Sequence, residues 1–459
     1  MTAGSRMYPV VTRRRLRRRP RTPAAVLVTG FAILIAVGTG LLFLPISRAA
    51  GEPADLVVAF FTATSAVCVT GLVVVDTATA WSPFGQLVVL GLVQVGGFGF
   101  MTGSTLLLLL FVGGRVGLRD RILAQAATGD LDLGGVIDIV RRIALFTILV
   151  EATGAAVLFA AFLGEAREVG QAAWYAVFHA ISAFNNAGFD LFGGFQSVAR
   201  YATSPVVLLT LGGLIVLGGL SVAIVADVLA RRHWGRLALE SKVVLLTTLV
   251  LLVAGAVAFA ALEWSNPATL GSIPVEHRPL NALFESVTLR SGGFAVINQG
   301  RLGEAALFVA MALMFIGGAS GSTAGGIKVN TFSVLLIAIL STVRGRPSAE
   351  AFGRRVPHEL IYRALSVALL SIAFVFVVAL GLEVLAGTSF VDTTFEAISA
   401  FGTVGLSTGI TPEMPPPAQI LEAGAMFVGR LGPLTLALAL ASRQRPVLYR
   451  PALESMRIG

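Results

Sequence analysis

The most informative segment of this chain reads Thr62-Ala-Thr-Ser-Ala-Val-Cys-Val-Thr-Gly-Leu72. It begins as an apolar helix and then breaks into a short Thr/Gly run inside a hydrophobic region. Backbone amides and carbonyls left free in lipid are costly, so a break at such a place needs a physical reason. Carbonyls that face a water-filled pore or an ion would supply that reason.

The composition around this stretch is that of a membrane protein. The chain has 459 residues, of which 56% are hydrophobic and only 13% are charged, whereas about a quarter of the residues of a soluble domain are charged. Crossing a bilayer takes ~20 consecutive apolar residues. Runs of that length occur throughout, for example at Ala25–Pro45, Val206–Leu229, Val243–Leu262 and Ala364–Leu385. We therefore expect a polytopic helical protein surrounded by the lipid bilayer.

The net charge of +9 does not indicate nucleic-acid binding, because the basic residues are confined to islands between the apolar runs. Loops of the other set, such as Asp76–Ser82, Phe189–Ser204 and Thr408–Gln419, carry almost none. This alternation follows the positive-inside rule and predicts that both termini are cytoplasmic. The basic islands are Arg13–Arg21, Arg115–Arg121, Arg141–Arg142, Arg231–Lys242, Arg344–Arg363 and Arg443–Arg457. The apolar run after the first island is long enough to span, so we expect an uncleaved first helix.

The opening phrase returns three more times along the chain. The four copies are Phe61–Leu72, Phe178–Phe189, Phe284–Phe294 and Phe395–Leu406. All four end in Gly followed by Phe or Leu, and three contain Ser-Ala before the break. Each lies between two long apolar segments, and the helical run before each break is too short to span. The repeating unit is therefore span, re-entrant pore helix, extended segment, span.

These units predict an all-α polytopic fold with eight membrane spans and four re-entrant pore helices. Because each unit crosses the membrane twice, all four share one orientation and can close around a pseudo-fourfold axis within one chain. The expected divisions are a basic cytoplasmic tail 1–23, repeat 1 at 24–115, repeat 2 at 116–235, repeat 3 at 236–345, repeat 4 at 346–445 and a cytoplasmic tail 446–459.

The chemistry of the four breaks favours cation selection by main-chain oxygens. A Gly after a helix can adopt positive φ, which lets successive carbonyls point toward one axis and replace the hydration shell of K⁺. The expected ion-binding backbone belongs to Val69, Thr70, Gly71, Asn186, Ala187, Gly188, Ser291, Gly292, Gly293, Thr403, Val404 and Gly405. Ordinary packing glycines could explain any one phrase. Four phrases at corresponding positions favour a selectivity filter.

These phrases, together with Gly321-Ser-Thr-Ala-Gly-Gly-Ile-Lys328, resemble the superfamily of K⁺ transporters that includes the bacterial Trk and Ktr translocating subunits and their plant relatives. The resemblance covers about residues 24–445. In that superfamily a Gly in all four filter segments accompanies K⁺ preference, and Ser at the first of these positions accompanies Na⁺ transport in some members. Gly71 therefore implies K⁺. The third phrase departs from the family pattern, since Ser291-Gly-Gly293 stands where Thr-Ala-Gly is usual.

The segment Ala305–Leu340 is too long for one span at ~1.5 Å per residue. Its middle, the intramembrane stretch 316–326, lacks apolar bulk and is tolerable in a membrane only when buried in protein or lining water. We expect a gating loop below the filter, with a small-residue packing surface as the alternative. Its candidate residues are Gly317, Gly318, Ser320, Gly321, Ser322, Thr323, Gly325 and Gly326.

Two cations accompany this loop. Charged residues at membrane depth usually face a cavity, and the resemblance implies that Arg430 forms a positive barrier beside the loop. Lys328 is the second gate candidate, with snorkelling to the interface as the alternative. Arg290 is expected to support the filter by pairing with Glu285 or Glu396, and Gln94 and Glu151 are expected to form interhelical polar contacts. His179 is expected to have a packing role.

The expected function is K⁺ uptake across a bacterial-type cell (plasma) membrane, as a channel or symport driven by the electrochemical gradient. The alternative is a Na⁺ or poorly selective cation transporter of the same fold. An enzyme is disfavoured because converging His, Asp and Glu residues are nearly absent from the spans, and one orientation for all repeats disfavours an inverted-repeat transporter. We expect K⁺, with Na⁺ second, as the cargo and no organic cofactor. The resemblance implies a homodimer that binds a cytoplasmic ring of nucleotide-binding regulatory subunits.

Overall fold

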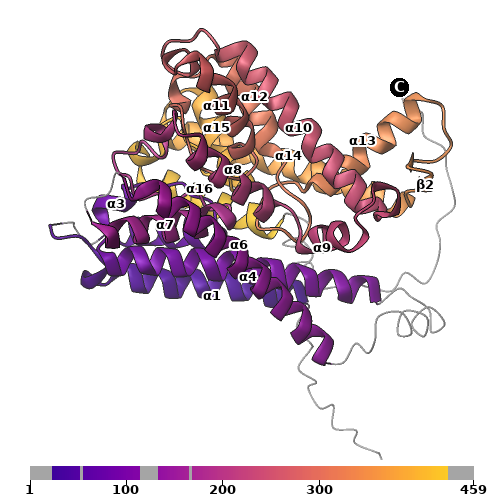
Figure 1. Ribbon diagram of the computed structural model, residues 1–459, viewed down its shortest axis with the longest axis horizontal. Coiled ribbons are helices and arrows are strands. Elements are labelled where there is room, and N and C mark those ends of the chain that lie inside the picture. The colour runs from indigo at the N-terminus through magenta and orange to yellow at the C-terminus, as the bar shows by residue number, and fades with distance from the viewer. Residues whose placement is uncertain (1–22, 52–54, 114–132, 165–167, 433–459) are drawn as a thin grey trace, which may run out of the picture.

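The computed structural model describes residues 23–51, 55–113, 133–164 and 168–432 (Figure 1). Of the expected features, most of the N-terminal tail, the C-terminal tail and the basic islands Arg13–Arg21, Arg115–Arg121 and Arg443–Arg457 lie outside these residues. Within them, the regular structure is helical apart from one small antiparallel hairpin of β1 (Glu350–Ala351) and β2 (Arg354–Arg355). A mostly helical membrane protein was the expected class.

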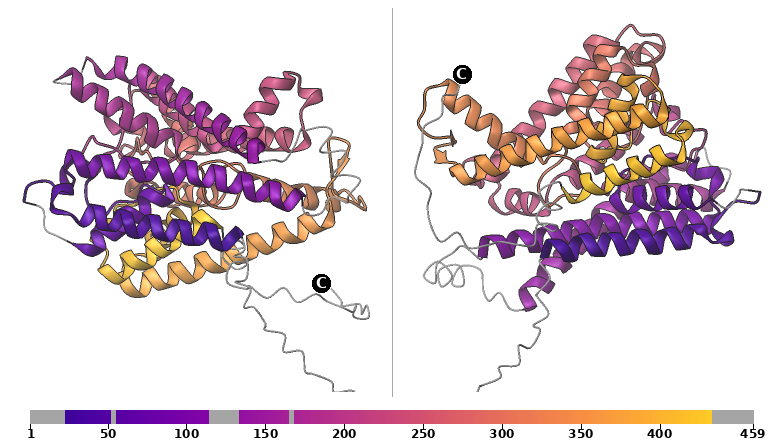
Figure 2. Two further views of the ribbon diagram at one scale, coloured as in Figure 1. Left: turned by 90° about the horizontal axis from the view of Figure 1, so that it is seen from below. Right: turned by 180° about the vertical axis from the view of Figure 1, so that it is seen from behind.

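Long apolar helices form the outer part of the molecule. In the described residues, five helices are long and apolar enough to cross a membrane, or six if one bent pair counts as a single span. Figure 2 shows that two of them, α1 (Pro23–Phe43) and α4 (Pro83–Gly113), lie side by side. The five long helices are α1 (Pro23–Phe43), α4 (Pro83–Gly113), α6 (Leu133–Phe162), α10 (Leu239–Glu263) and α14 (His358–Ala386).

Four short helices lie inside this frame, and each ends within one of the four repeated phrases. They are α2 (Leu56–Cys68), α7 (Val169–Phe184), α11 (Arg278–Thr288) and α15 (Phe390–Gly402). Asp55 caps α2 by accepting from the amide of Val57 at 2.7 Å, which satisfies one of the amides left over at a helix start. The last three residues of each of these helices are buried.

The helix that follows each short helix varies most between the repeats. Repeat 1 has the unbroken α4, and repeat 4 has α16 (Pro416–Leu431). Repeat 3 has α12 (Glu304–Phe315) and α13 (Val329–Val343), separated by an irregular loop. The break expected inside Ala305–Leu340 is therefore present.

Repeat 2 corrects one prediction, because the apolar run Val206–Leu229 is not a single straight span. It forms α8 (Pro205–Gly219) and α9 (Val222–Arg231), bent by 97°. The physical cause is the glycine pair at the end of α8. The freed carbonyls of Gly218 and Gly219 accept hydrogen bonds from the amides of Thr323 and Ala319 at 3.1 and 2.9 Å. Tertiary bonds thus replace the helical bonds that the run would otherwise make.

The remaining elements are short turns of helix in the connections. They are α3 (Thr77–Ala80) and the 3₁₀ turns η1 (Pro45–Ser47), η2 (Ala199–Tyr201), η3 (Trp234–Arg236), η4 (Leu270–Ser272), η5 (Val275–His277), η6 (Gln299–Arg301) and η7 (Thr411–Glu413).

The same small-residue contact recurs in all four repeats. A glycine in the first helix of each repeat faces a leucine from the helix that follows the phrase, so closely that an added Cβ would lie 2.6 to 2.8 Å from that side chain. The pairs are Gly38 with Leu92, Gly154 with Leu214, Gly255 with Leu313 and Gly381 with Leu421. Small residues let membrane helices approach closely, so this contact sets the spacing of the two helices in each repeat.

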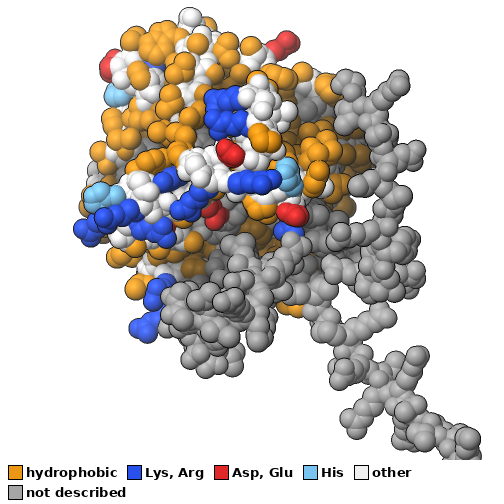
Figure 3. All heavy atoms as spheres, turned by 90° about the vertical axis from the view of Figure 1, so that its right-hand side faces the viewer, with side chains coloured by type: hydrophobic (Ala, Val, Ile, Leu, Met, Phe, Trp, Pro, Cys, Tyr) orange, Lys and Arg blue, Asp and Glu red, His pale blue; other side chains and the backbone are white. Residues whose placement is uncertain are grey.

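The surface agrees with a position in lipid. Outward residues of the long helices are apolar and exposed, for example Leu145 at 66%, Val257 at 62% and Phe376 at 65%. Figure 3 views the end of the molecule that holds α9, α13 and the β1–β2 hairpin, where Lys and Arg side chains gather between hydrophobic areas. Large exposed apolar surfaces of this kind mark contact with a membrane or with partner proteins.

Candidate functional site

The four segments that follow the short helices share one backbone conformation. In each of them two residues, separated by one, have positive φ. These pairs are Val69 (56°) and Gly71 (92°), Asn186 (60°) and Gly188 (69°), Ser291 (72°) and Gly293 (75°), and Thr403 (44°) and Gly405 (94°). The glycines were predictable from the sequence. The first member of each pair is a non-glycine residue that normally avoids this region, and sequence reasoning missed it.

The amides of these segments are tied back to the preceding helix. In the first repeat the amide of Thr70 donates to the Ser65 carbonyl at 2.8 Å and the amide of Gly71 donates to Ser65 Oγ at 3.0 Å. Ser399 holds Val404 and Gly405 in the same way, at 2.9 and 3.2 Å. The serine of the recurring Ser-Ala pair therefore fixes the segment that follows it.

The carbonyls of the same segments are left almost without donors. Among the described residues, of the twelve carbonyls expected to bind ions only that of Thr403 accepts a hydrogen bond, from Ser291 Oγ at 2.7 Å. Buried carbonyls are normally satisfied by protein or water. A run of free carbonyls on four matching segments is therefore the pattern of a site that binds a cation through main-chain oxygens.

The four segments meet one another in cyclic order. A Cβ added to Gly71 would lie 2.2 Å from the Ala187 carbonyl oxygen, and one added to Gly188 would lie 2.6 Å from the Gly293 Cα. A Cβ on Gly293 would lie 2.7 Å from the Val404 oxygen, and one on Gly405 would lie 2.1 Å from the Thr70 oxygen. Each segment thus touches the next, and the fourth touches the first. No side chain fits at these four positions.

In three of the four segments, the chain beyond the glycine is held by a side chain from the short helix. In these three repeats, the acceptor is the side chain of the residue directly after the first Phe of the phrase. It accepts a hydrogen bond from a backbone amide 11 or 12 positions later in the chain. His179 Nε2 accepts from Leu191 at 3.3 Å, Glu285 from Val296 at 3.3 Å and Glu396 from Thr408 at 2.9 Å. His179 also stacks on Phe192 with ring centroids 4.2 Å apart, in agreement with its expected packing role.

The Gly/Ser/Thr loop between α12 and α13 lies against the inner side of these segments. The hydroxyl of Thr323 bonds to Asn186 Oδ1 at 3.0 Å, and the amide of Gly325 donates to Ser291 Oγ at 3.2 Å. The loop also closes on itself, because the amide of Gly317 donates to the Ile327 carbonyl at 2.9 Å. The residues proposed for a gate are therefore in contact with the second and third segments.

Arg430 and Lys328 both anchor this loop. Arg430 is fully buried, and its guanidinium donates to the carbonyls of Thr323 and, at 3.3 Å, Gly96. The Lys328 ammonium donates to the Ala324 carbonyl. Lys328 is only partly buried.

Phe100 contacts both of these cations, and no sequence pattern singled it out. The Arg430 guanidinium lies 4.5 Å and the Lys328 ammonium 4.9 Å from the centre of the Phe100 ring. A cation over an aromatic face within ~6 Å is attracted by the ring quadrupole. Phe100 therefore stabilises two like charges close to each other beside the loop.

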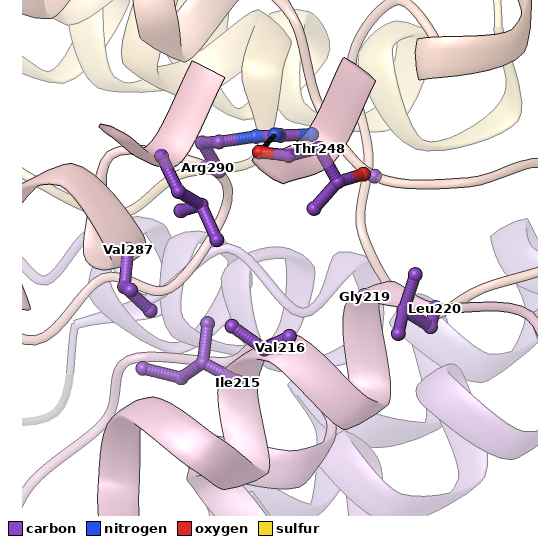
Figure 4. Close-up of a pocket in the computed structure, with 9 residues that line it drawn as sticks. Ile215, Val216, Gly219, Leu220, Thr248, Val287 and Arg290 are labelled. Atoms are coloured by element: carbon purple, nitrogen blue, oxygen red, sulfur yellow. Dashed lines mark hydrogen bonds between the residues drawn. The ribbon is translucent and has the colours of Figure 1, made fainter. Parts of the chain in front are cut away.

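The prediction for Arg290 is wrong, because its side chain does not pair with Glu285 or Glu396. Its guanidinium donates to the carbonyls of Thr248 at 3.3 Å and Gly317 at 2.7 Å, which still connects the third segment to the loop. Figure 4 shows the guanidinium turned toward Thr248 at the edge of a cavity that Ile215, Val216 and Val287 also line. That cavity measures about 20 Å³, which is room for about one water molecule.

The expected polar contact between Gln94 and Glu151 is present. Gln94 Nε2 donates to Glu151 at 3.2 Å, and Asn185 Nδ2 donates to both Gln94 and Glu151, at 2.7 and 3.0 Å. The network links α4, α6 and α7 directly behind the second segment. Asn185 thus braces this segment from behind, while Asn186 faces the loop.

Comparison with known proteins gives consistent matches over nearly the whole chain. The family model described as TrkH, cation transport protein, matches residues 11–445. The chain is 38% identical to the Ktr system potassium uptake protein B of Bacillus subtilis, covering 94% of this chain and 95% of that protein. It is 35% identical to the potassium/sodium uptake protein NtpJ of Enterococcus hirae, covering 98% and 100%.

A solved structure matches as well. The potassium transporter TrkH from Vibrio parahaemolyticus superposes with a TM-score of 0.74 at 17% identity, covering 95% of this chain and 88% of that one. This likeness supports the fold.

Proposed function

Because the chain belongs to the TrkH family of cation transport proteins, we propose that it takes up K⁺ across a bacterial-type cell membrane. The observation that carries this proposal is the closed ring of four segments with matching backbone conformation and free carbonyls. Oxygens in such rings replace the hydration shell of K⁺. The relative from Bacillus subtilis is named a potassium uptake protein.

The proposed architecture is four span–pore-helix–filter–span repeats around a pseudo-fourfold pore, at 24–115, 116–235, 236–345 and 346–445. In this arrangement α2, α7, α11 and α15 are re-entrant pore helices. The recurring glycine–leucine contact and the cyclic order of the four segments support it. We place both termini in the cytoplasm, on the strength of the basic islands Arg231–Lys242 and Arg344–Arg363.

We propose that the loop 316–326 with Lys328 and Arg430 is the gate. The loop closes the inner side of the ring through Thr323 and Gly325, and the two cations oppose entry of another cation. Opening requires the bonds of Arg430 to the Thr323 and Gly96 carbonyls to break. The proposed partners are a second copy of the chain and a cytoplasmic ring of nucleotide-binding subunits that moves the gate.

A second candidate function is transport of Na⁺ as well as K⁺. The relative NtpJ, whose whole length is matched, is named a potassium/sodium uptake protein. Ser291 also places a hydroxyl within 2.7 Å of the Thr403 carbonyl, so one oxygen of the ring has a competing partner.

Flux into proteoliposomes tests these proposals. An inward K⁺ gradient is expected to drive ion uptake, while an equal Na⁺ gradient drives much less, and liposomes without protein show neither. Equal uptake from both gradients would establish the second candidate instead. Lack of uptake from either gradient, in the presence and absence of a regulatory ring, would contradict both.

A further inference from the structure

Glu422, on α16, is a buried acid with no partner among the described residues. Its side chain is 0% exposed, and neither Oε1 nor Oε2 has a hydrogen-bond donor or acceptor. An ionised carboxylate without donors in a low-dielectric interior is strongly unfavourable. The buried Glu263 has no such problem, because Thr269 Oγ1 and the amide of Gly303 donate to it at 2.5 and 2.9 Å.

Packing requirements do not explain why a carboxyl group occupies position 422 of α16. Gly96, Gly218 and Gly429 occupy corresponding positions, because an added Cβ on each would lie 1.7 to 2.1 Å from a carbonyl oxygen in the last turn of α2, α7 or α15. Counting back the same seven residues from each leads to Val89, Leu211 and Glu422. Val89 and Leu211 are both fully buried aliphatic side chains. Repeats 1 and 2 therefore fill this position without a carboxyl group.

Glu422 interacts electrostatically with a second carboxylate, that of Glu396. Glu396 lies on the pore helix α15, which packs against α16. Glu396 is well supplied with donors: Ser407 Oγ at 2.7 Å, the Thr408 amide at 2.9 Å and Thr411 Oγ1 at 2.9 Å. These bonds stabilise an ionised Glu396. Two neighbouring carboxylates in a low dielectric do not both ionise, so the acid without donors is the one that keeps a proton.

No cation neutralises this pair in the described residues. The helices packed on α16 are α2, α14 and α15. Between Leu56 and Cys68, α2 has no charged residue, α15 contributes Asp392, and α14 contributes Glu383, which accepts from Thr393 at 3.0 Å. The His358, Glu359 and Arg363 side chains of α14 are near its far, N-terminal end. Arg430 is bonded to backbone carbonyls, and neither recorded ion pair involves Glu396 or Glu422.

We propose that Glu422 is a proton-binding site behind the fourth filter segment. With the proton bound, the Glu396–Glu422 pair carries one negative charge, and Glu396 holds the chain beyond Gly405 through Thr408. Loss of the proton adds a second charge inside the filter wall and strains these bonds. K⁺ conduction then varies with pH. This last step rests on the proposed K⁺ transport, whereas the proton site does not.

Infrared spectroscopy of the full-length protein tests the proton site directly. The wild type is expected to show the C=O stretching band of a protonated carboxylic acid, which shifts in D₂O and fades as the pH is raised. Glu422→Gln should lose this band, and the matched buried control Glu263→Gln should keep it. A band of unchanged size in Glu422→Gln would overturn the assignment.

Two further measurements complete the test. Glu422→Leu, which installs the residue type of the second repeat, is expected to fold and to unfold at a temperature no lower than the wild type. Severe loss of folded protein in this variant would show that the carboxyl has a structural role and would contradict the proposal. In proteoliposomes the pH dependence of K⁺ flux should disappear in Glu422→Gln, and an unchanged dependence would count against the coupling. A wild type with the infrared band but no K⁺ flux would refute the transport proposal and leave the proton site standing.

Discussion

Replacing Gly71 by serine is expected to weaken the preference for K⁺ over Na⁺. The φ of Gly71 is 92°, and an added Cβ would lie 2.2 Å from the Ala187 carbonyl oxygen of the next segment. A non-glycine residue in this conformation costs about 1–3 kcal/mol. The serine must therefore push the Ala187 carbonyl away from its place in the ring.

The size of the loss in K⁺ preference follows from how the strain at position 71 is relieved. If the strain is relieved by displacing carbonyls that otherwise fit K⁺, the preference for K⁺ falls by about 1–3 kcal/mol, which is about 5- to 150-fold. The helices are not touched, so helical content and elution on size exclusion should stay as in the wild type.

The assay is competition between K⁺ and Na⁺ for uptake into proteoliposomes, with Gly91→Ser as the matched control. Gly91 is an exposed helical glycine on α4, and nothing lies within 4 Å of an added Cβ. The control should behave as the wild type. An unchanged K⁺ preference in a folded Gly71→Ser protein would refute the filter assignment.

Three other predictions concern the gate, the packing and the outer mouth. Arg430→Gln should raise K⁺ flux about tenfold for each ~1.4 kcal/mol that the charge adds to the barrier. The control Arg301→Gln, at an exposed arginine, should leave flux unchanged, and equal flux in both variants would argue against a gate at Arg430. Gly218→Ala places a Cβ 1.7 Å from a backbone carbonyl and should destabilise the protein by about 1–3 kcal/mol, while Gly213→Ala, with open space around it, should not; thermal unfolding of both variants decides the matter. Burial raises the pKa of Asp190, in the loop beyond the second segment, to about 6, so the folded state binds this proton more tightly than the unfolded chain and stability should fall as the pH rises from about 4 to about 6. Asp190→Asn should flatten that part of the curve of unfolding temperature against pH, and an identical curve would contradict the effect.

The four segments of the candidate site could be located from the sequence because a recurring phrase leaves a strong pattern. Four copies ending in Gly at 71, 188, 293 and 405 are visible without a structure, and so is the Gly/Ser/Thr run after α12. Both depend on local composition.

Features that depend on contacts between repeats were not predictable in this way. The bend between α8 and α9 exists because the carbonyls of Gly218 and Gly219 bond to a loop about 100 residues further along the chain. Arg290 could reach several acceptors, and only the fold shows that carbonyls of Thr248 and Gly317 are the ones it meets. Phe100 resembles any other aromatic residue of a span until two cations are found against its ring.

We expect carbonyls of the four segments to bind K⁺ on a common axis. Crystals grown with Rb⁺ in place of K⁺ test this binding, because anomalous scattering locates Rb⁺ without assumptions about the protein. Anomalous peaks are expected inside the ring formed by Gly71, Gly188, Gly293 and Gly405, and these peaks should weaken in Gly71→Ser. Rb⁺ bound only elsewhere in the protein, with no peak inside this ring, would contradict this expectation.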